Sequence, residues 1–187
     1  MKRTILIAED EEKMRRILEV NLQDQFQVIL AKDGVEALRL FKENEISLLL
    51  TDMRMPEKDG LSLLHDVKRL RPEVPVILIT AYGTIESAVS AMKEGATDYL
   101  LKPIKMEEVE LVIQRALFQV DLIDENRKLR EEIKSLYGMD TIISKHPKMT
   151  KIMGMVQQVA DSKATVLIEG ESGTGKEMLS RIVHARS

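Results

Sequence analysis

The stretch Ile46–Gly60, ISLLLTDMRMPEKDG, decides how the rest of the chain is interpreted. It opens on an almost wholly apolar run, Ile46 to Leu50, of the kind that forms a strand buried on both faces of a parallel sheet. The run gives way to Asp52, and the proline and glycine that follow signal a loop. A carboxylate therefore lies at the carboxyl end of a central strand, where open α/β sheets place their ligand crevice. The alternative is that Asp52 only caps the next helix, because Asp is common at strand exits.

The composition is that of a globular protein. The chain has 187 residues, a formal net charge of −3, 44% hydrophobic residues and 32% charged residues. This balance allows a buried core and gives no overall attraction to nucleic acid or membrane surfaces. The absence of cysteine excludes disulfides, thiolate metal sites and cysteine nucleophiles, and agrees with a cytoplasmic location. No apolar run suggests a signal peptide or approaches the roughly 18 residues of a membrane span.

Short apolar runs alternate with helical patterns as far as about residue 118. The expected strands are Thr4–Ala8, Phe26–Ala31, Ile46–Leu50, Val76–Ile79 and Asp98–Leu101. The expected helices are Met14–Leu22, Val35–Phe41, Leu61–Leu70, Ile85–Met92 and a last one that begins near Met106. This alternation predicts an α/β fold with right-handed crossovers and a parallel sheet that is covered on both faces.

Four of the five strands end in charged or hydroxyl side chains that can take part in chemistry, namely Glu9 with Asp10, Asp52, Thr80 and Lys102. In such a sheet these ends meet at one edge, where three carboxylates repel one another unless a cation lies among them. Oxygen ligands of this kind suit Mg²⁺. Beside the metal, the Asp52 carboxylate would be a nucleophile towards a phosphoryl group. Thr80 and Lys102 would then donate hydrogen bonds to the phosphoryl oxygens, although Lys102 taken alone could be an ordinary surface lysine.

Four segments, ILIAEDE, LLLTDMRMPEKDG, VILITAYG and GATDYLLKP, together resemble the receiver domain of bacterial two-component response regulators over residues 1–120. The resemblance implies a flavodoxin-like fold with the strand order 2-1-3-4-5. It implies that a sensor histidine kinase phosphorylates Asp52. It also implies a Mg²⁺ site made by Asp10, Asp52 and the backbone carbonyl of Arg54, with Glu9 acting through water.

The same resemblance assigns roles to three further positions. It implies that Thr80 and Lys102 contact the phosphoryl group, which would make the enzymatic chemistry of this part a transfer onto its own Asp52. It implies that Thr80 and Tyr99 form a switch that responds to phosphorylation, and that the Lys102-Pro103 bond is cis.

Residues 121–138 are interpreted as a helical linker that forms a coiled coil. Apolar residues and one asparagine recur at alternating four- and three-residue steps, at Leu122, Asn126, Leu129, Ile133 and Leu136. This is the a/d seam of a heptad repeat, and an asparagine at an a position is typical of a parallel dimer in a fixed register. The alternative is a lone amphipathic helix that lies on the receiver, because only about two heptads are present.

Residues 139–187 contain a helical pattern from Met149 to Val159 and an expected strand, Ala164–Glu169. The sequence GESGTGKE follows, before a helix expected from Lys176. It fits the phosphate-binding loop pattern except at Glu177, where serine or threonine is usual. The predicted nucleotide-binding residues are Gly170, Glu171, Ser172, Gly173, Thr174, Gly175, Lys176 and Glu177. The alternative is a glycine-rich turn with no ligand.

This motif, after a receiver and a helical linker, resembles the start of the AAA+ ATPase domain of NtrC-type activators of sigma-54 RNA polymerase, in which glutamate at this position is usual. We therefore expect the N-terminal part of such a regulator, with ATP binding, sigma-54 RNA polymerase contact and DNA contact dependent on further parts of a longer protein. The alternative is a stand-alone phosphorelay or interaction module, and a complete ATPase is disfavoured.

Overall fold

The computed structural model describes residues 2–81, 85–137, 147–160 and 165–186. The chain divides into two compact units, residues 1–122 and 123–187, which are described separately. Among the described residues, no helix combines the length and the hydropathy that a bilayer crossing requires.

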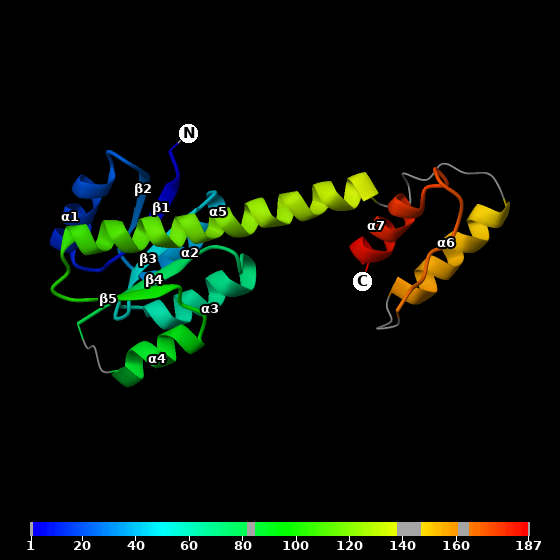
Figure 1. The fold of residues 1–187 in the computed structure, drawn as a ribbon. Helices are drawn as coiled ribbons and strands as arrows, with labels where there is room; N and C mark the ends of the chain where they lie inside the picture. The colour runs from blue at the N-terminus through cyan, green and yellow to red at the C-terminus, as the bar shows by residue number, and fades with distance from the viewer. Residues whose placement is uncertain (1, 82–84, 138–146, 161–164, 187) are drawn as a thin grey trace. The chain divides into compact units, whose positions relative to one another are not determined.

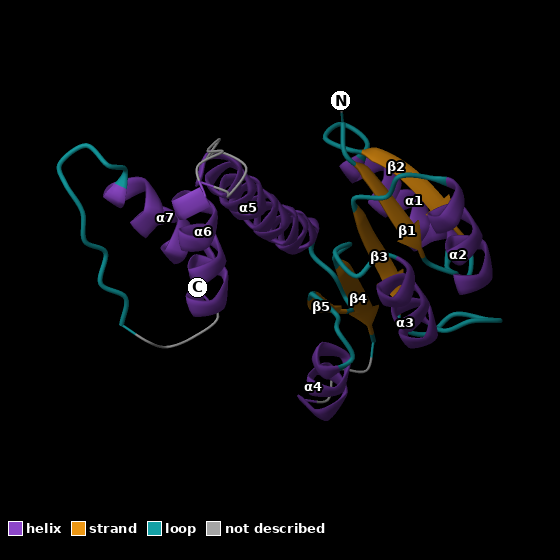
Figure 2. Ribbon diagram, turned by 90° about the vertical axis from the view of Figure 1, so that its right-hand side faces the viewer, coloured by secondary structure: helices purple, strands orange, loops and turns teal. Residues whose placement is uncertain are grey.

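The first unit is built on a five-stranded parallel sheet whose strands run side by side in one direction (Figures 1 and 2). The strands are β1 (Thr4–Ala8), β2 (Gln27–Ala31), β3 (Leu48–Asp52), β4 (Val76–Thr80) and β5 (Asp98–Leu101). Their order, β2-β1-β3-β4-β5, confirms the predicted flavodoxin-like fold. β3 begins two residues later than predicted and extends to Asp52, which pairs with Ile79 of β4.

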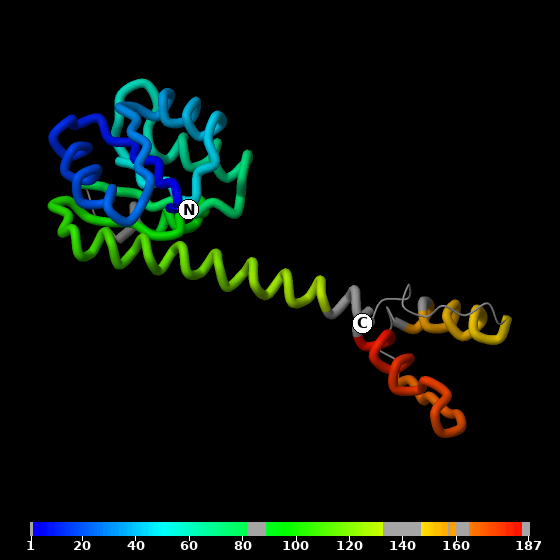
Figure 3. Tube along the Cα trace, turned by 90° about the horizontal axis from the view of Figure 1, so that it is seen from above, coloured from blue at the N-terminus to red at the C-terminus, as the bar shows by residue number. Residues whose placement is uncertain are grey.

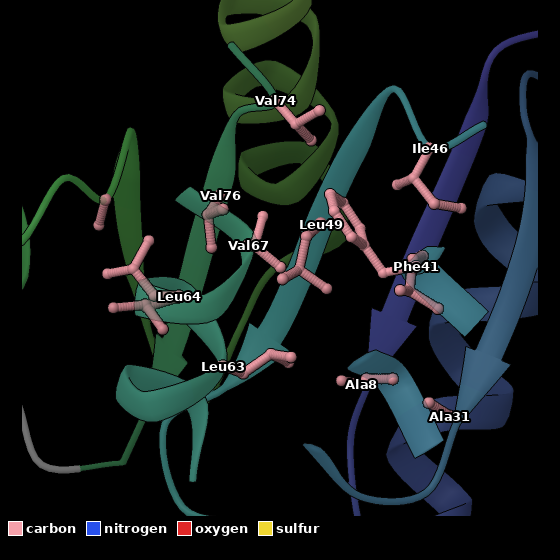
Figure 4. Packing of buried hydrophobic residues seen from close by; sticks show 14 of the residues in the cluster. Ala8, Ala31, Phe41, Ile46, Leu49, Leu63, Leu64, Val67, Val74 and Val76 are labelled. Atoms are coloured by element: carbon pink, nitrogen blue, oxygen red, sulfur yellow. The ribbon is translucent and has the colours of Figure 1, made fainter. Parts of the chain in front are cut away.

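Helices cover both faces of this sheet. They are α1 (Glu12–Leu22), α2 (Gly34–Glu43), α3 (Gly60–Leu70), α4 (Ile85–Lys93) and α5 (Met106–Tyr137). Because successive residues of a strand point to opposite faces of the sheet, apolar runs such as Leu48–Leu50 contribute side chains to two hydrophobic cores, one on each face. Leu49 packs with residues of α2 and α3, whereas Leu48 and Leu50 pack with residues of α1 and α5. Figure 4 shows the first of these cores, with Phe41, Leu49 and Val67 in one cluster.

The loop after β3 returns to the sheet at the start of α3. The carboxylate that caps α3 belongs to Asp59, whose side chain accepts a hydrogen bond from the Ser62 amide at 2.7 Å. This bond lowers the pKa of the Asp59 carboxyl below its ordinary value. The interpretation of Asp52 as a helix cap is therefore wrong, which leaves its carboxylate available for another role.

Gly60 lets α3 begin directly against the strand end that carries Asp52. A Cβ atom at this position would lie 2.2 Å from the backbone oxygen of Asp52. We expect Gly60→Ala to lower the free energy of unfolding by about 2 kcal/mol, because backbone atoms must move to relieve the overlap. Urea denaturation of the purified protein measures this change. An unchanged midpoint with an unchanged slope would contradict the close approach.

α5 is the predicted last helix, and it continues without a break past Leu122 (Figure 3). Its first half buries Val109, Val112, Ile113, Ala116 and Leu117 against the sheet. A second set of apolar side chains is exposed, namely Leu111, Phe118, Leu122, Ile123 and Leu129. Ile113 and Leu122 are nine residues apart, about 2.5 helical turns, so they point to opposite sides of the helix. The side chains of Ile133 and Leu136 lie outside the described residues.

The second unit contains α6 (Pro147–Ala160) and α7 (Lys176–Arg186), which contact each other. Both helices agree with the predicted ones. The predicted strand over Ala164–Glu169 is wrong where the structure describes it, because residues 165–171 have no regular secondary structure. A strand needs a neighbour for its backbone hydrogen bonds, and the described residues of this unit contain no other strand.

Candidate functional site at the carboxyl edge of the sheet

Three carboxylates meet where β1 and β3 end. Glu9 and Asp52 are buried and Asp10 is exposed, and one oxygen of each lies within 4.8 Å of the others. The two strands bring them together because Ala8 pairs with Thr51, so the residues that follow leave the sheet side by side. The convergence expected from the sequence is thus present in the fold.

Lys102 provides the positive charge among these carboxylates. Its Nζ lies 3.0 and 3.1 Å from the two oxygens of Glu9 and forms an ion pair with Oδ2 of Asp52. The backbone holds it at this edge, because the Lys102 amide donates to the backbone oxygen of Thr80 at 2.8 Å. The Lys102-Pro103 bond is cis, as predicted. Lys102 therefore contacts two carboxylates, whereas the sequence suggested only a contact with a phosphoryl group.

Burial and charge change how these groups ionise. Burial raises the pKa of the Glu9 carboxyl to about 7, with a further contribution from the negative Asp52 and opposition from Lys102. For Lys102, burial favours the neutral amine, but the hydrogen bonds and charges of Asp52 and Glu9 outweigh it and raise the pKa of the ammonium. The site thus holds excess negative charge that one ammonium only partly neutralises.

Asp52 is fixed by contacts to both of its oxygens. Oδ1 accepts a hydrogen bond from the Arg54 amide at 3.0 Å, and Oδ2 carries the ion pair with Lys102. Thr80, at the end of the neighbouring β4, is 3% exposed. Tyr99 on β5 is half-buried and packs against the core that contains residues of α2 and α3. The structure therefore brings Thr80 to the same sheet edge. Tyr99 lies on β5, and Lys102 directly follows the end of that strand.

The acidic cluster fits a hard divalent cation. Glu9 Oε2 is buried and accepts no hydrogen bond from the described residues, although it lies close to the Lys102 ammonium. The ion pair with Lys102 offsets the burial of this oxygen only in part, and a divalent cation would complete its environment. Mg²⁺ takes oxygen ligands, usually one or two carboxylates directly together with several waters, and this cluster can provide them.

One residue of this region was not recognised from the sequence. Arg15 of α1 donates to the backbone oxygens of Glu9 and Asp10, at 2.6 and 3.2 Å. Its position was a usable signal, because a cation four residues into a helix opposes the positive end of the helix dipole. Such an arginine is expected to have a compensating contact.

The glycine-rich segment of the second unit forms an open cleft of about 570 Å³. Residues Ser172–Met178 and Arg181 line it, which includes six of the eight predicted nucleotide-binding residues. Gly173 and Gly175 have φ angles of 80° and 82°, which glycine adopts without strain. The Lys176 ammonium lies 2.8 Å from the Gly170 oxygen and 2.5 Å from the Glu171 oxygen, so it bridges the start of the segment.

Comparison with known proteins decides the family. Residues 5–114, more than half of the chain, match the family model of the response regulator receiver domain. The chain is a response regulator. Residues 142–187 match the model of the sigma-54 interaction domain. The two matches, in this order, are those of sigma-54-dependent response regulators, as the two motifs in the sequence indicated.

Curated relatives support the same assignment. The regulatory protein AtoC of Escherichia coli K12 is 39% identical over 98% of this chain and 40% of its own length. The transcriptional regulatory protein ZraR of Klebsiella oxytoca is 38% identical over 98% of this chain and 40% of its own length. The response regulator thus spans about two fifths of these relatives.

Solved structures agree with the fold. A response regulator receiver domain protein from Clostridium thermocellum superposes with a TM-score of 0.62 and 34% identity, over 65% of this chain and 98% of its own. NtrX from Brucella abortus, solved in complex with ATP, has a TM-score of 0.66 and 32% identity, over 100% of this chain and 41% of its own.

Proposed function

We propose that this response regulator accepts a phosphoryl group on Asp52 from a sensor histidine kinase in the cytoplasm. The observation that carries the proposal is the position of Asp52, a buried carboxylate at the end of the central strand with Glu9, Asp10 and Lys102 around it. The backbone amide of Arg54 donates a hydrogen bond to Oδ1 of Asp52, and Oδ2 pairs with the Lys102 ammonium. This arrangement suits a carboxylate nucleophile in a partly buried site.

The transfer forms one bond and breaks one. A carboxylate oxygen of Asp52 attacks the phosphorus of the kinase phosphohistidine. The phosphorus–nitrogen bond breaks with its electron pair on the ring nitrogen, and the ring leaves as neutral imidazole because its other nitrogen already carries a proton. Asp10, Asp52 and the backbone carbonyl of Arg54 would hold Mg²⁺, with Glu9 acting through water, and the metal would offset the charge of the phosphoryl oxygens. Lys102 and the Thr80 hydroxyl would donate to those oxygens, and Tyr99 would move when Thr80 is drawn towards them.

The mass of the intact protein tests this proposal. Incubation with acetyl phosphate and Mg²⁺ is expected to add one phosphoryl group, which hydroxylamine removes because an acyl phosphate is labile. EDTA in place of Mg²⁺ should prevent the addition. A protein that stays unmodified at saturating Mg²⁺ would contradict the proposal.

We assign residues 1–120 to the receiver, 121–138 to a linker and 139–187 to the beginning of an ATPase domain. The boundary at residue 138 lies outside the described residues. In a longer protein, phosphorylation would control an activator that acts on sigma-54 RNA polymerase at DNA. The nucleotide complex of NtrX favours ATP at Gly170–Glu177, and the Lys176 ammonium would exchange its two carbonyl contacts for phosphate oxygens. The alternative is a relay module without ATPase output.

A homodimer through α5 completes the proposal. In the heptad register with Asn126 at position a, the exposed Leu122 and Leu129 occupy d positions. In two copies of the helix, each g position then lies next to an e position of the other copy, and the residues at these positions are complementary. In a parallel pair Glu125 meets Arg130 of the partner subunit, and Phe118 meets the partner's Ile123. An antiparallel pair would bring Glu125 against glutamates instead, so the charges favour the parallel arrangement.

Charge exchange tests the parallel register. Glu125→Arg should weaken the dimer by roughly tenfold in dissociation constant, because it sets like charges opposite each other. Glu125→Arg combined with Arg130→Glu should restore the wild-type value. Glu131→Arg is the matched control, since Glu131 already pairs with Arg127 within its own helix. Sedimentation equilibrium measures all four proteins. A double variant that stays as weak as Glu125→Arg would contradict the register.

A further inference from the structure

The turn between β1 and α1, which carries Glu9 and Asp10, is fixed from one side by Arg15. One nitrogen of its guanidinium, Nη1, donates to the backbone oxygen of Glu9 at 2.6 Å and to the backbone oxygen of Asp10 at 3.2 Å. From the other side, the Glu9 amide donates to the Ala31 oxygen at 3.2 Å. The peptide groups of both acidic residues are thus held by groups outside the turn itself.

Local structure alone does not account for an arginine at this position. α1 begins at Glu12 after Glu11, whose side chain makes no capping hydrogen bond. A guanidinium near this end of the helix meets the positive pole of the helix dipole, which disfavours it. The neighbouring Arg16 relieves its charge in another way, through an exposed ion pair with Glu19. Arg15 instead turns back to the two carbonyl groups that precede the helix.

The side chains of this turn depend on its backbone. Glu9 is wholly buried, Asp10 is exposed, and both must direct an oxygen to the same point as Asp52 for a cation to bind. The repulsion between these carboxylates acts to open the turn. Two hydrogen bonds from a charged donor to the Glu9 and Asp10 carbonyls oppose that opening.

We propose that Arg15 is a positioning residue for divalent cation binding in this response regulator. It holds the peptide groups of Glu9 and Asp10 so that their carboxylates converge on Asp52 before the cation arrives. The inference rests on the proposed metal site, but it concerns the affinity for the cation and not the identity of the phosphorylated residue.

Mn²⁺ binding provides a direct test that does not depend on phosphorylation. Free Mn²⁺ is counted by electron paramagnetic resonance in titrations of the wild type, Arg15→Met and Arg16→Met. Loss of a group that orients metal ligands typically weakens binding 10- to 100-fold, so Arg15→Met should raise the Mn²⁺ dissociation constant about tenfold. Arg16→Met removes a positive charge from the next residue and keeps Arg15. It should leave the dissociation constant unchanged or slightly lower it.

The rate of phosphorylation by acetyl phosphate gives the second readout. Arg15→Met should raise the Mg²⁺ concentration for half-maximal rate by a similar factor and leave the rate at saturating Mg²⁺ within about twofold, because Asp52 is untouched. Arg15→Lys should lie between Arg15→Met and the wild type.

Two results would overturn the role of Arg15. One is an Arg15→Met protein that binds Mn²⁺ as tightly as Arg16→Met or more tightly, since the arginine would then act only as a repelling charge. The other is a loss of the saturated rate in step with a loss of thermal stability, since the role would then be structural. A wild type that binds Mn²⁺ but accepts no phosphoryl group would contradict the proposed function and leave the role of Arg15 supported by the titrations.

Discussion

Asp52→Asn is expected to lower the rate of phosphorylation by acetyl phosphate at least roughly a hundredfold, because the amide is not a nucleophile. The variant should still fold. Asparagine keeps the shape of the side chain and can still accept from the Arg54 amide, which bonds to Oδ1 of Asp52. It also removes one of the carboxylates that crowd this edge of the sheet. The initial rate is measured by intact mass at saturating Mg²⁺.

Asp66→Asn is the matched control for this variant. Asp66 is also an aspartate paired with a lysine, Lys58, but it lies on α3 and its side chain is 31% exposed. Its replacement should leave the rate unchanged. Persistence of the phosphoryl adduct in Asp52→Asn would place the reaction on another side chain, and equal losses in both variants would indicate damage to the fold.

Lys102→Met is expected to destabilise the metal-free protein by about 3 kcal/mol, because it leaves buried carboxylates without their counter-ion. Glu9 is 0% exposed and the Asp52 side chain 9% exposed, so water cannot replace the ammonium efficiently. Urea denaturation at pH 8 measures the effect. The pKa of Glu9 is about 7 beside Lys102, and it rises further in the variant because Lys102 lowers it.

Mg²⁺ should recover much of this loss. A divalent cation among the three carboxylates supplies the charge that Lys102→Met removes, so added Mg²⁺ should raise the stability of the variant more than that of the wild type. Lys58→Met is the control, since its half-exposed ion pair with Asp66 should contribute about 1 kcal/mol or less and show no such response to Mg²⁺. A Lys102→Met protein that is as stable as the wild type without metal would contradict the electrostatic description of the site.

The sequence predicted the fold well because its signals were local and repeated. In residues 1–120 each apolar run of about five residues forms one strand, and the alternation with helices predicted a parallel sheet. The meeting of Glu9, Asp10 and Asp52 followed from topology, since the carboxyl ends of parallel strands share one edge. Knowledge of the receiver family added the strand order and the cis bond at Lys102-Pro103, and both are present.

The features that sequence reasoning missed depend on contacts between distant residues. The ion pair of Lys102 with Glu9 joins positions 93 residues apart, and no periodicity encodes it. The contacts of Arg15 depend on a turn whose backbone conformation the pattern did not predict. The strand predicted at Ala164–Glu169 was inferred from a run of apolar residues, but a run becomes a strand only when another strand lies beside it.

The heptad seam on α5 stays a prediction. The seam residues Leu122 and Leu129 are exposed. The sequence did not indicate that the exposed apolar side of the helix starts earlier, at Leu111 and Phe118, on the side opposite to the buried Ile113. This became visible only when the sheet had defined which side of the helix is covered.

Borohydride reduction of the phosphorylated protein, followed by peptide mapping, identifies the residue that accepts the phosphoryl group. The reagent converts an aspartyl phosphate to homoserine and so marks the residue that carried the phosphoryl group. We expect homoserine at position 52 alone, in the presence of Mg²⁺ and acetyl phosphate. Homoserine at Asp10 or Asp59, or no homoserine in a protein that has gained a phosphoryl group, would contradict it.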